Sequence, residues 1–292
     1  MRKAEAPQAK LNLPRLDALI KAALAEDVGT GDVTTTAAVI PNLMGSGTLI
    51  AREPGVLAGM PVVCRLLRTF DKRLRLSRAL KDGSVLKANT VIARISGPAA
   101  PMLTAERTML NLLQYLSGIA TATRHYVDAA AGTGVKILDT RKTLPGWRNL
   151  VKYAVAVGGG QNHRIGLFDQ VLIKDNHLAA SGLSPAEAVT LARRKASPRL
   201  RVEVEVETIR DAREAARAGA DIVMLDNMSV AHMRRAVQAI RTVAPQTIIE
   251  ASGGITLRNI ATVARIGVDW ISVGAITHSV PSLDIALEIG PA

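Results

Sequence analysis

The chain has 292 residues, of which 48% are hydrophobic, so it can bury a substantial core and general disorder is excluded. Lysine and arginine outnumber aspartate and glutamate by 37 to 25, which gives a net charge of +12. Only 2% of the residues are aromatic, which leaves few platforms for stacking bases. The composition therefore favours an anionic small substrate over nucleic acid.

Cysteine usage and hydropathy predict a soluble protein of the cytoplasm. Cys64 is the only cysteine, so no intrachain disulfide can form, and its apolar helical neighbours predict a buried structural thiol. The N-terminus is polar and basic, without the apolar stretch of a signal peptide. No run approaches the roughly 20 apolar residues that span a bilayer, so we expect no membrane association.

The first part of the chain predicts an accessory α/β domain. Residues 1–13 indicate a loose arm, and Pro14 predicts the start of a helix. The acidic stretch 26–32 is consistent with a turn that caps a helix or with a metal-binding loop, and its spacing does not match the Ca²⁺ loop pattern. Turn-bounded segments further on predict a helix at 61–71 and strands at 47–51, 56–58, 74–77 and 90–95.

A long helix is predicted from about residue 104 to residue 131. Thr104 is its expected N-cap, which places Arg107 in the first turn. A cation in the first turn opposes the helix dipole, so Arg107 is expected to need an anionic partner. A salt bridge to Glu106 or a neighbour and a contact with a bound anion are both open.

After Gly132, strands and helices alternate, which predicts a parallel sheet with helices between its strands. Six strands of this kind favour a barrel over an open sheet. No GxGxxG turn and no GK[S/T] loop is present, which argues against an open-sheet nucleotide-binding fold. The expected strands are 135–138, 170–173, 202–206, 221–225, 246–250 and 269–273, and the expected helices are 148–157, 184–196, 208–218, 229–243 and 256–266.

Polar or glycine-rich residues follow each of these strands. In a barrel the C-terminal ends of the strands converge on one mouth, so these residues are expected to share a site. The segments 139–142 and 174–177, with the loop 161–164 between them, bring several cationic side chains to that mouth. By themselves these three segments predict a site for a polyanion.

An acidic row lies on the third strand of this half. Glu203, Glu205 and Glu207 alternate with valines, so the three acids share one face of the strand. We expect the valines to pack under helices and the acids to point into the barrel, where carboxylates need cations such as lysine, arginine or Mg²⁺. Glu203, the deepest of the row, favours a structural ion pair, whereas Glu205 and Asp226 are the better ligand candidates.

Glycine-rich segments follow the last two predicted strands, at residues 252–254 and 273–275. Glycine lets the backbone approach a ligand closely, and barrel enzymes often hold a phosphate with backbone N–H groups at this place. The mouth would then offer a phosphate cradle, a pair of carboxylates and a cluster of cations. This combination suits a phosphorylated sugar together with a second, polyanionic reactant.

These segments together resemble the quinolinate phosphoribosyltransferase family, also called nicotinate-nucleotide pyrophosphorylase (carboxylating), nearly from end to end. Gln161 stands where this family often has a histidine. The matching motifs are 26–35 (EDVGTGDVTT), 51–59 (AREPGVLAG), 106–107 (ER), 116–121 (LSGIAT), 139–143 (DTRKT), 158–164 (GGGQNHR), 173–177 (IKDNH), 203–205 (EVE), 225–227 (LDN) and 250–255 (EASGGI).

Two alternatives remain beside this resemblance. The related phosphoribosyltransferase-like protein of molybdenum-transport operons shares the TRKT motif, but it differs in the segment that corresponds to 174–177. A basic RNA-binding protein on a barrel scaffold is the alternative from another functional class, and it would bind RNA with a steep dependence on salt.

The resemblance implies an N-terminal α/β sandwich domain over residues 1–115. It implies an incomplete α/β barrel of TIM-like type, with about seven strands, over residues 116–292, whose last residues pack back on the N-terminal domain. The implied reaction transfers a phosphoribosyl group from phosphoribosyl pyrophosphate (PRPP) to quinolinate with decarboxylation, giving nicotinate mononucleotide, CO₂ and pyrophosphate in de novo NAD biosynthesis. The implied cofactor is Mg²⁺, and the implied assembly is a homodimer, or a higher oligomer, in which Arg107 enters the neighbouring site.

The resemblance also implies a role for each site residue. Contact with the two quinolinate carboxylates falls to Arg107, Arg141, His163 and Arg164, and Thr140 belongs to the same substrate-binding set. The implied catalytic residues are Lys142 and Lys174 between the two substrates, and Glu205 and Asp226 at the ribose hydroxyls and Mg²⁺, which they contact directly or indirectly. The implied phosphate-binding residues are Ser252, Gly253, Gly254, Gly274 and His278.

Overall fold

The computed structural model describes residues 11–291, so most of the arm predicted over residues 1–13 lies outside the described part. The chain divides into two compact units, each assembled from separate stretches. The parallel unit includes residues 125–143 and 160–279, and the antiparallel unit includes residues 8–124, 144–159 and 280–292. The boundary that we predicted between residues 115 and 116 lies within one continuous helix, α4 (Ala99–Ala129).

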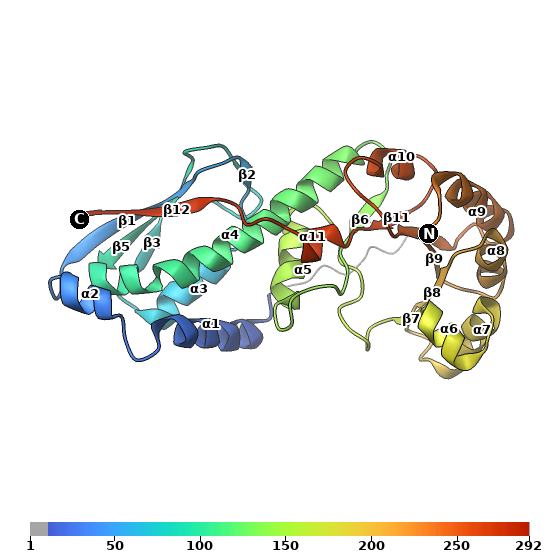
Figure 1. Cartoon of the computed structure of the whole chain (residues 1–292), viewed down its shortest axis with the longest axis horizontal. Helices are drawn as coiled ribbons and strands as arrows, with labels where there is room; N and C mark the ends of the chain where they lie inside the picture. The colour runs from blue at the N-terminus through green and yellow to red at the C-terminus, as the bar shows by residue number, and fades with distance from the viewer. Residues whose placement is uncertain (1–10, 292) are drawn as a thin grey trace. The chain divides into compact units, whose positions relative to one another are not determined.

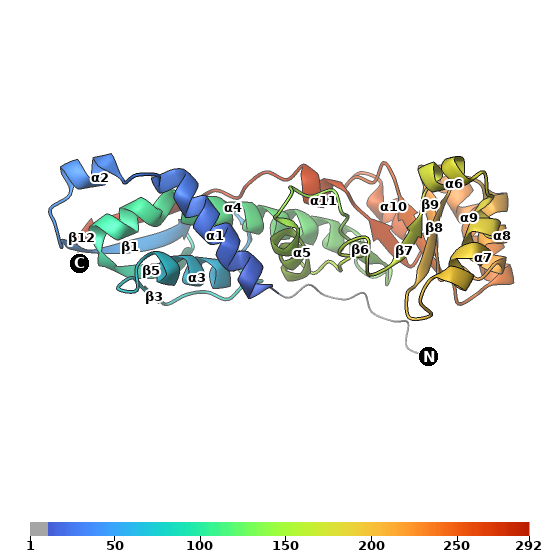
Figure 2. The ribbon, with the colours of Figure 1, turned by 90° about the horizontal axis from the view of Figure 1, so that it is seen from below.

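The antiparallel unit is built on a four-stranded sheet with the order β12-β1-β5-β3. The C-terminal strand β12 pairs with β1 from the beginning of the chain, with Ile285 opposite Ala51. Figure 2 shows α1 beside α3 in this unit. The strands are β1 (Met44–Ala51), β3 (Arg75–Ser77), β5 (Val91–Pro98) and β12 (Ile285–Pro291), with a separate pair of β2 (Gly55–Val56) and β4 (Val85–Leu86), and the helices besides α4 are α1 (Leu13–Val28), α2 (Val33–Ala38), α3 (Met60–Phe70) and α5 (Arg148–Val157).

The acidic stretch 26–32 proves to be a turn that caps a helix. The Asp32 side chain is the N-cap of α2 and accepts a hydrogen bond from the Thr35 backbone N–H at 2.9 Å. Hydrogen bonds from the Thr35 hydroxyl and amide lower the pKa of the Asp32 carboxyl. The alternative of a metal-binding loop is therefore not supported. Cys64, expected to be buried, is only half-buried on α3.

The predicted start of the long helix was wrong. α4 begins at Ala99, directly after β5. Pro101 is accepted in its first turn, because the N–H that proline lacks would have no helical partner there. Thr104 therefore lies inside the helix, where its hydroxyl donates to the Ala100 carbonyl oxygen, and it is not an N-cap. Arg107 is exposed and lies beyond the first turn, so the argument from the helix dipole does not apply to it.

The parallel unit contains a six-stranded parallel sheet with the order β6-β11-β10-β9-β8-β7. β6 and β7 are the two edges of this order and do not pair with each other, so the sheet does not close into a complete barrel, and a single parallel bridge from Leu138 to Gln161 extends it beyond β6. The predicted α/β class and the six strands are confirmed. The strands are β6 (Lys136–Leu138), β7 (Val171–Ile173), β8 (Val202–Val206), β9 (Ile222–Asp226), β10 (Ile248–Ser252) and β11 (Trp270–Ser272).

The helices of this unit alternate with its strands along the chain, and α7, α8 and α9 lie along one side of β7, β8 and β9 (Figure 1). Buried valines of β8 and the buried Ala212, Ala215 and Ala216 of α8 supply the apolar contact between these layers. None of the described helices is long and apolar enough to cross a membrane. The helices are α6 (Asp175–Ser181), α7 (Pro185–Lys195), α8 (Ile209–Arg217), α9 (Val230–Val243), α10 (Ile260–Ala264) and α11 (Ala275–His278).

Candidate active site

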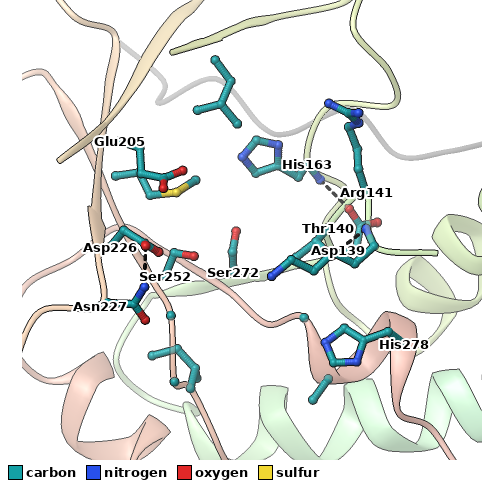
Figure 3. Close-up of a pocket in the computed structure, with 18 of the residues that line it drawn as sticks. Asp139, Thr140, Arg141, His163, Glu205, Asp226, Asn227, Ser252, Ser272 and His278 are labelled. Atoms are coloured by element: carbon teal, nitrogen blue, oxygen red, sulfur yellow. Dashed lines mark hydrogen bonds between the residues drawn. The ribbon is translucent and has the colours of Figure 1, made fainter. Parts of the chain in front are cut away.

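A cavity of about 720 Å³ opens at the C-terminal ends of the parallel strands (Figure 3). All of the predicted site residues except Arg107 line it, and Arg107 belongs to the antiparallel unit. Figure 3 shows Thr140, Arg141 and His163 on one side of the cavity and Glu205, Asp226 and Ser252 on the other. We call Thr140, Arg141, Lys142, His163 and Arg164 the cation side, and Lys174, Glu205, Asp226, Ser252, Gly253 and Gly254 the acid side.

A buried carboxylate organises the cation side. Asp139 follows β6 and is fully buried, and its Oδ2 accepts from the Asn162 side-chain amide at 2.6 Å. Its Oδ1 accepts from the His163 backbone N–H at 2.9 Å. These bonds, with the backbone pairing of Leu138 and Gln161, tie the loop 161–164 to the end of β6. Arg164 is thereby placed in the same cavity wall as Arg141.

The two arginines of the cation side create a demand for an anion. Arg164 is only 7% exposed, and burial, followed by the charge of Arg141, lowers its pKa. The buried Nε of Arg164 makes no hydrogen bond within the part of the chain that the structure describes. Two neighbouring guanidinium groups, one of them with an unbonded Nε, favour a ligand that carries carboxylates, which pair with arginine in a bidentate geometry.

His163 sits over two fully buried carboxylates, Glu203 and Glu250. Its Nε2 lies 3.2 Å from Glu203 Oε2 and 3.5 Å from Glu250 Oε2, while its Nδ1 accepts from the Arg164 backbone N–H at 2.8 Å. Burial lowers the pKa of His163, but the charges of Glu203 and Glu250 outweigh it and raise that pKa well above its usual value. Nε2 is thus the ring nitrogen that faces the two carboxylates, while Nδ1 faces the backbone of the loop.

Glu203, one of the two carboxylates of this cluster, has a raised pKa as well. Burial and the nearby charge of Glu250 raise the pKa of Glu203. The side chains of Gln170 and Ser272 donate to Glu203 and Glu250 respectively. Among the described residues, His163, Glu203 and Glu250 form the only group of three metal-ligating side chains close enough to share an ion. Because His163 Nε2 lies close to both carboxylates, we interpret the cluster as a structural network of the histidine and the two acids.

The acid side is built around Glu205 and Asp226, at the ends of the paired strands β8 and β9. Lys174 Nζ lies 2.5 Å from Glu205 Oε2, and the Lys174 backbone N–H donates to His177 Nδ1 at 2.9 Å. Asp226 receives a hydrogen bond from the Asn227 side-chain amide at 2.6 Å. Within the described residues Asp226 makes no ion pair, so its carboxylate lines the cavity without a cationic partner. Carboxylates of this kind suit Mg²⁺ and sugar hydroxyls.

Glycines line the remaining wall of the cavity. Gly253 and Gly254 have positive φ angles of 83° and 62°, a conformation that other residues rarely adopt. A Cβ atom on Gly274 would lie 2.9 Å from His278 Nε2, so glycine allows the histidine to lie against the backbone there. The nearby Thr140 and Thr277 hydroxyls are 3.0 Å apart. This wall can offer backbone N–H groups to a phosphate, as the sequence predicted.

Two family models match the chain in sequence order. The N-terminal domain of quinolinate phosphoribosyl transferase matches residues 32–117, and the C-terminal domain of the same enzyme matches residues 119–288. The chain belongs to the quinolinate phosphoribosyltransferase family. This membership covers the cavity and both units, and it decides between this family and the two alternatives left open by the sequence.

Individual proteins of the quinolinate phosphoribosyltransferase family show the same similarity. The nicotinate-nucleotide pyrophosphorylase [carboxylating] of Mycobacterium leprae is 46% identical over 273 residues, which is 92% of this chain and 95% of that protein. The probable nicotinate-nucleotide pyrophosphorylase [carboxylating] of Bacillus subtilis is 43% identical over 283 residues, 96% of this chain and 95% of that protein. The structure of the Francisella tularensis nicotinate-nucleotide pyrophosphorylase has a TM-score of 0.91 at 39% identity and covers 98% of this chain and 100% of that one.

Several residues that shape the cavity were not predicted from the sequence. Asp139 and Asn227 stood in the recognised strand-end segments but were given no role, although both line the cavity. Glu250 and Ser272 form the buried partners below His163, and Asn162 holds Asp139. Polar residues directly after predicted strands were the available signal, but their partners lie on other strands and do not show in local spacing.

Proposed function

We propose that this cavity binds quinolinate on its cation side and PRPP on its acid side, and joins them. The ring nitrogen of quinolinate attacks the anomeric carbon of PRPP, and the bond to pyrophosphate breaks. Loss of the 2-carboxylate as CO₂ then leaves a carbanion beside the quaternary ring nitrogen, and its protonation gives nicotinate mononucleotide. The observation that carries this proposal is the division of one cavity into an arginine-rich wall and a wall of carboxylates and glycines.

Quinolinate carries two carboxylates, and the cation side offers partners for both. Arg141 and Arg164 would hold them with their planar donor groups, and the Nε of Arg164 supplies a donor that no described residue uses. Thr140 and His163 complete this wall. Because both ring nitrogens of His163 are already engaged, we assign its contribution to the ring edge and to the position of Arg164.

Lys142 and Lys174 lie where the two substrates would meet. Both line the cavity, and Lys174 is tied to Glu205 by an ion pair. An ammonium group at this position offsets the charge that develops on the departing pyrophosphate. Ser252, Gly253, Gly254, Gly274 and His278 would hold the phosphate groups of PRPP through backbone N–H groups and the imidazole.

Glu205 and Asp226 would contact the ribose hydroxyls and steady positive charge at the anomeric carbon. The same two carboxylates fit Mg²⁺, since this ion prefers oxygen ligands and Asp226 has no ion-pair partner among the described residues. When bound with PRPP, Mg²⁺ would neutralise part of the pyrophosphate charge. We propose that the ion reaches these side chains directly or through water.

Arg107 supports the proposal of a homodimer. It is exposed on α4, in the antiparallel unit, and it does not line the cavity in the parallel unit of the same chain. An arginine donated by a second copy would bring a further cation to the quinolinate carboxylates. We propose that the resulting dimer works in the cytoplasm, as the composition of the chain predicts.

The direct test mixes the protein, Mg²⁺ and PRPP with either quinolinate or nicotinate. We expect nicotinate mononucleotide and one CO₂ per turnover only with quinolinate, and loss of product when a chelator removes Mg²⁺. Activity with nicotinate alone would disprove the assignment. For the assembly, inactive Arg107→Ala and inactive Lys142→Ala proteins should recover activity when mixed, because one site of a mixed dimer then has both residues. Mixing without any recovery would contradict a donated Arg107.

A further inference from the structure

Asn227 has a conformation that is costly for a residue with a side chain. Its φ angle is +51°, in the left-handed region. The other described non-glycine residues with positive φ are Asn42, Arg78 and Asn89, and none of these lines the cavity. Backbone strain of this kind persists where the surrounding structure requires it, and it is often found at functional sites.

The left-handed turn folds the Asn227 side chain back over the residue before it. The Asn227 amide nitrogen Nδ2 donates to Asp226 Oδ2 at 2.6 Å, and both side chains lie together at the cavity wall (Figure 3). Asp226 is the last residue of β9, so the strand fixes its backbone while the amide fixes its carboxylate. One carboxylate oxygen is thus occupied by Asn227, and Oδ1 is left for a ligand.

Asn227 also connects Asp226 to the glycine wall. Its backbone N–H donates to the Ser252 carbonyl oxygen at 3.1 Å. A Cβ atom on Gly253 would lie only 2.1 Å from Asn227 Oδ1 and 2.8 Å from Asn227 N. The asparagine side chain therefore fills the space that any side chain at position 253 would need. Asn227 and Gly253 are sterically complementary.

We infer that Asn227 is a positioning residue that orients the Asp226 carboxylate toward the ribose and Mg²⁺ of PRPP; this rests on the proposed function. An amide suits this task better than an ammonium group, because it directs the carboxylate without neutralising its charge. The contrast with Glu205 supports this reading, since Lys174 forms an ion pair with that acid. Asn227 acts through Asp226, so its loss should affect PRPP and not quinolinate.

Two substitutions separate the side chain from the backbone conformation. Asn227→Asp keeps the size and tolerates a left-handed backbone, but it replaces the donor with a second carboxylate. Asn227→Gly permits the same backbone and removes the side chain. We expect Asn227→Gly to lower kcat/KM for PRPP about tenfold and Asn227→Asp to lower it further, with the KM for quinolinate unchanged. Asn89→Gly, at another left-handed asparagine that does not line the cavity, should change neither parameter.

A double substitution tests the steric link. Gly253→Ala should be more harmful in the native background than in the Asn227→Gly background, because the clash with the Asn227 side chain is absent in the latter, while the contact with the backbone N and the strain of the positive φ angle are common to both. Additive losses would show that the two positions do not interlock.

The outcomes distinguish this inference from the proposed function. If Asp226→Ala abolishes turnover while both Asn227 variants keep the native kcat/KM for PRPP, the positioning role is wrong and the function stands. An equal rise in the KM values for PRPP and quinolinate would mark Asn227 as merely structural and would also overturn the inference. If Asp226→Ala itself turns over quinolinate normally, the role assigned to Asp226 in the proposed function fails. Thermal unfolding of each variant verifies that the fold is kept.

Discussion

The two sides of the cavity are held in place by different means. On the acid side, strands β8, β9 and β10 pair in parallel, with Asp226 directly opposite Ser252, so the hydrogen-bond ladder sets the positions of the functional residues. The cation side follows the short strand β6, and its residues stand on loops that Asp139 ties together. The ladder spreads positional control over many bonds, whereas the loops of the cation side are held by the buried Asp139 carboxylate and a single backbone bridge to Gln161.

Substitutions on the two sides should therefore have different effects. On the acid side a substitution should mainly remove a functional group, because the sheet holds the backbone in place. Residues of the cation side should fail through lost position as well, because Asp139 and its two hydrogen-bond donors define that wall. The following substitutions test this contrast.

The largest effect is expected at Glu205. Glu205→Gln removes the negative charge at the ribose and leaves the Lys174 ammonium group without its carboxylate partner. We expect kcat to fall by about 100-fold or more, with little change in thermal stability. Steady-state kinetics and a melting curve give both quantities. The matched control is Glu207→Gln, an exposed acid two residues further on; near-native turnover of Glu205→Gln would remove Glu205 from the mechanism.

Arg164 tests the chemistry of the cation side. Arg164→Lys keeps a positive charge but loses the planar, bidentate donor group. We expect the KM for quinolinate to rise by about tenfold to 100-fold while the KM for PRPP stays near its native value. Arg210→Lys, on the exposed face of α8, serves as the control. A rise in the KM for PRPP alone would contradict the division of the cavity.

Asp139 tests how the cation side is held. Asp139→Asn keeps the shape, but its new amide group points a donor at either the Asn162 amide or the His163 N–H. A buried donor left without an acceptor costs about 1–3 kcal/mol, so we expect that loss in the free energy of unfolding and a rise in the KM for quinolinate. Chemical denaturation and kinetics measure the two. Unchanged quinolinate binding would show that the loops hold their positions without Asp139.

The smallest effect is expected in the antiparallel unit. The Tyr153 hydroxyl donates to Asp82 at 2.7 Å, and burial, with that hydrogen bond, raises the pKa of Tyr153. Asp82 also accepts from the Gly59 and Met60 backbone N–H groups at the start of α3, so it keeps partners when the hydroxyl is removed. Tyr153→Phe should cost about 1 kcal/mol of unfolding free energy and leave both KM values unchanged. A kinetic effect would mean that this unit influences the cavity.

Much of the parallel unit could be predicted because its signals are local. The valines of 202–206 alternate with acids, and Gly219 and Gly267 end their helices just before a strand, so the strands and most of the predicted helices were located within about two residues. The exceptions are α10, which begins at Ile260 and not at residue 256, and the short helices α6 and α11, which were not predicted. The rule that parallel strands carry their ligands at their C-terminal ends predicted that the strand-end segments share one mouth. The family resemblance supplied the individual residues, and the thirteen of them other than Arg107 line the cavity.

The sequence by itself determined the order of strands and helices along the parallel unit and which strand ends carry charged groups. Both follow from short-range periodicity and turn residues. Only the tertiary structure decided that residues 144–159 belong with the first part of the chain, that α4 continues directly from β5, and that Asn227 fills the space above Gly253. The reason is physical. Periodicity reports which face of an element is buried, but hydrogen-bond and steric partners such as Asp139 and Asn162 are chosen by contacts between segments that are distant in sequence.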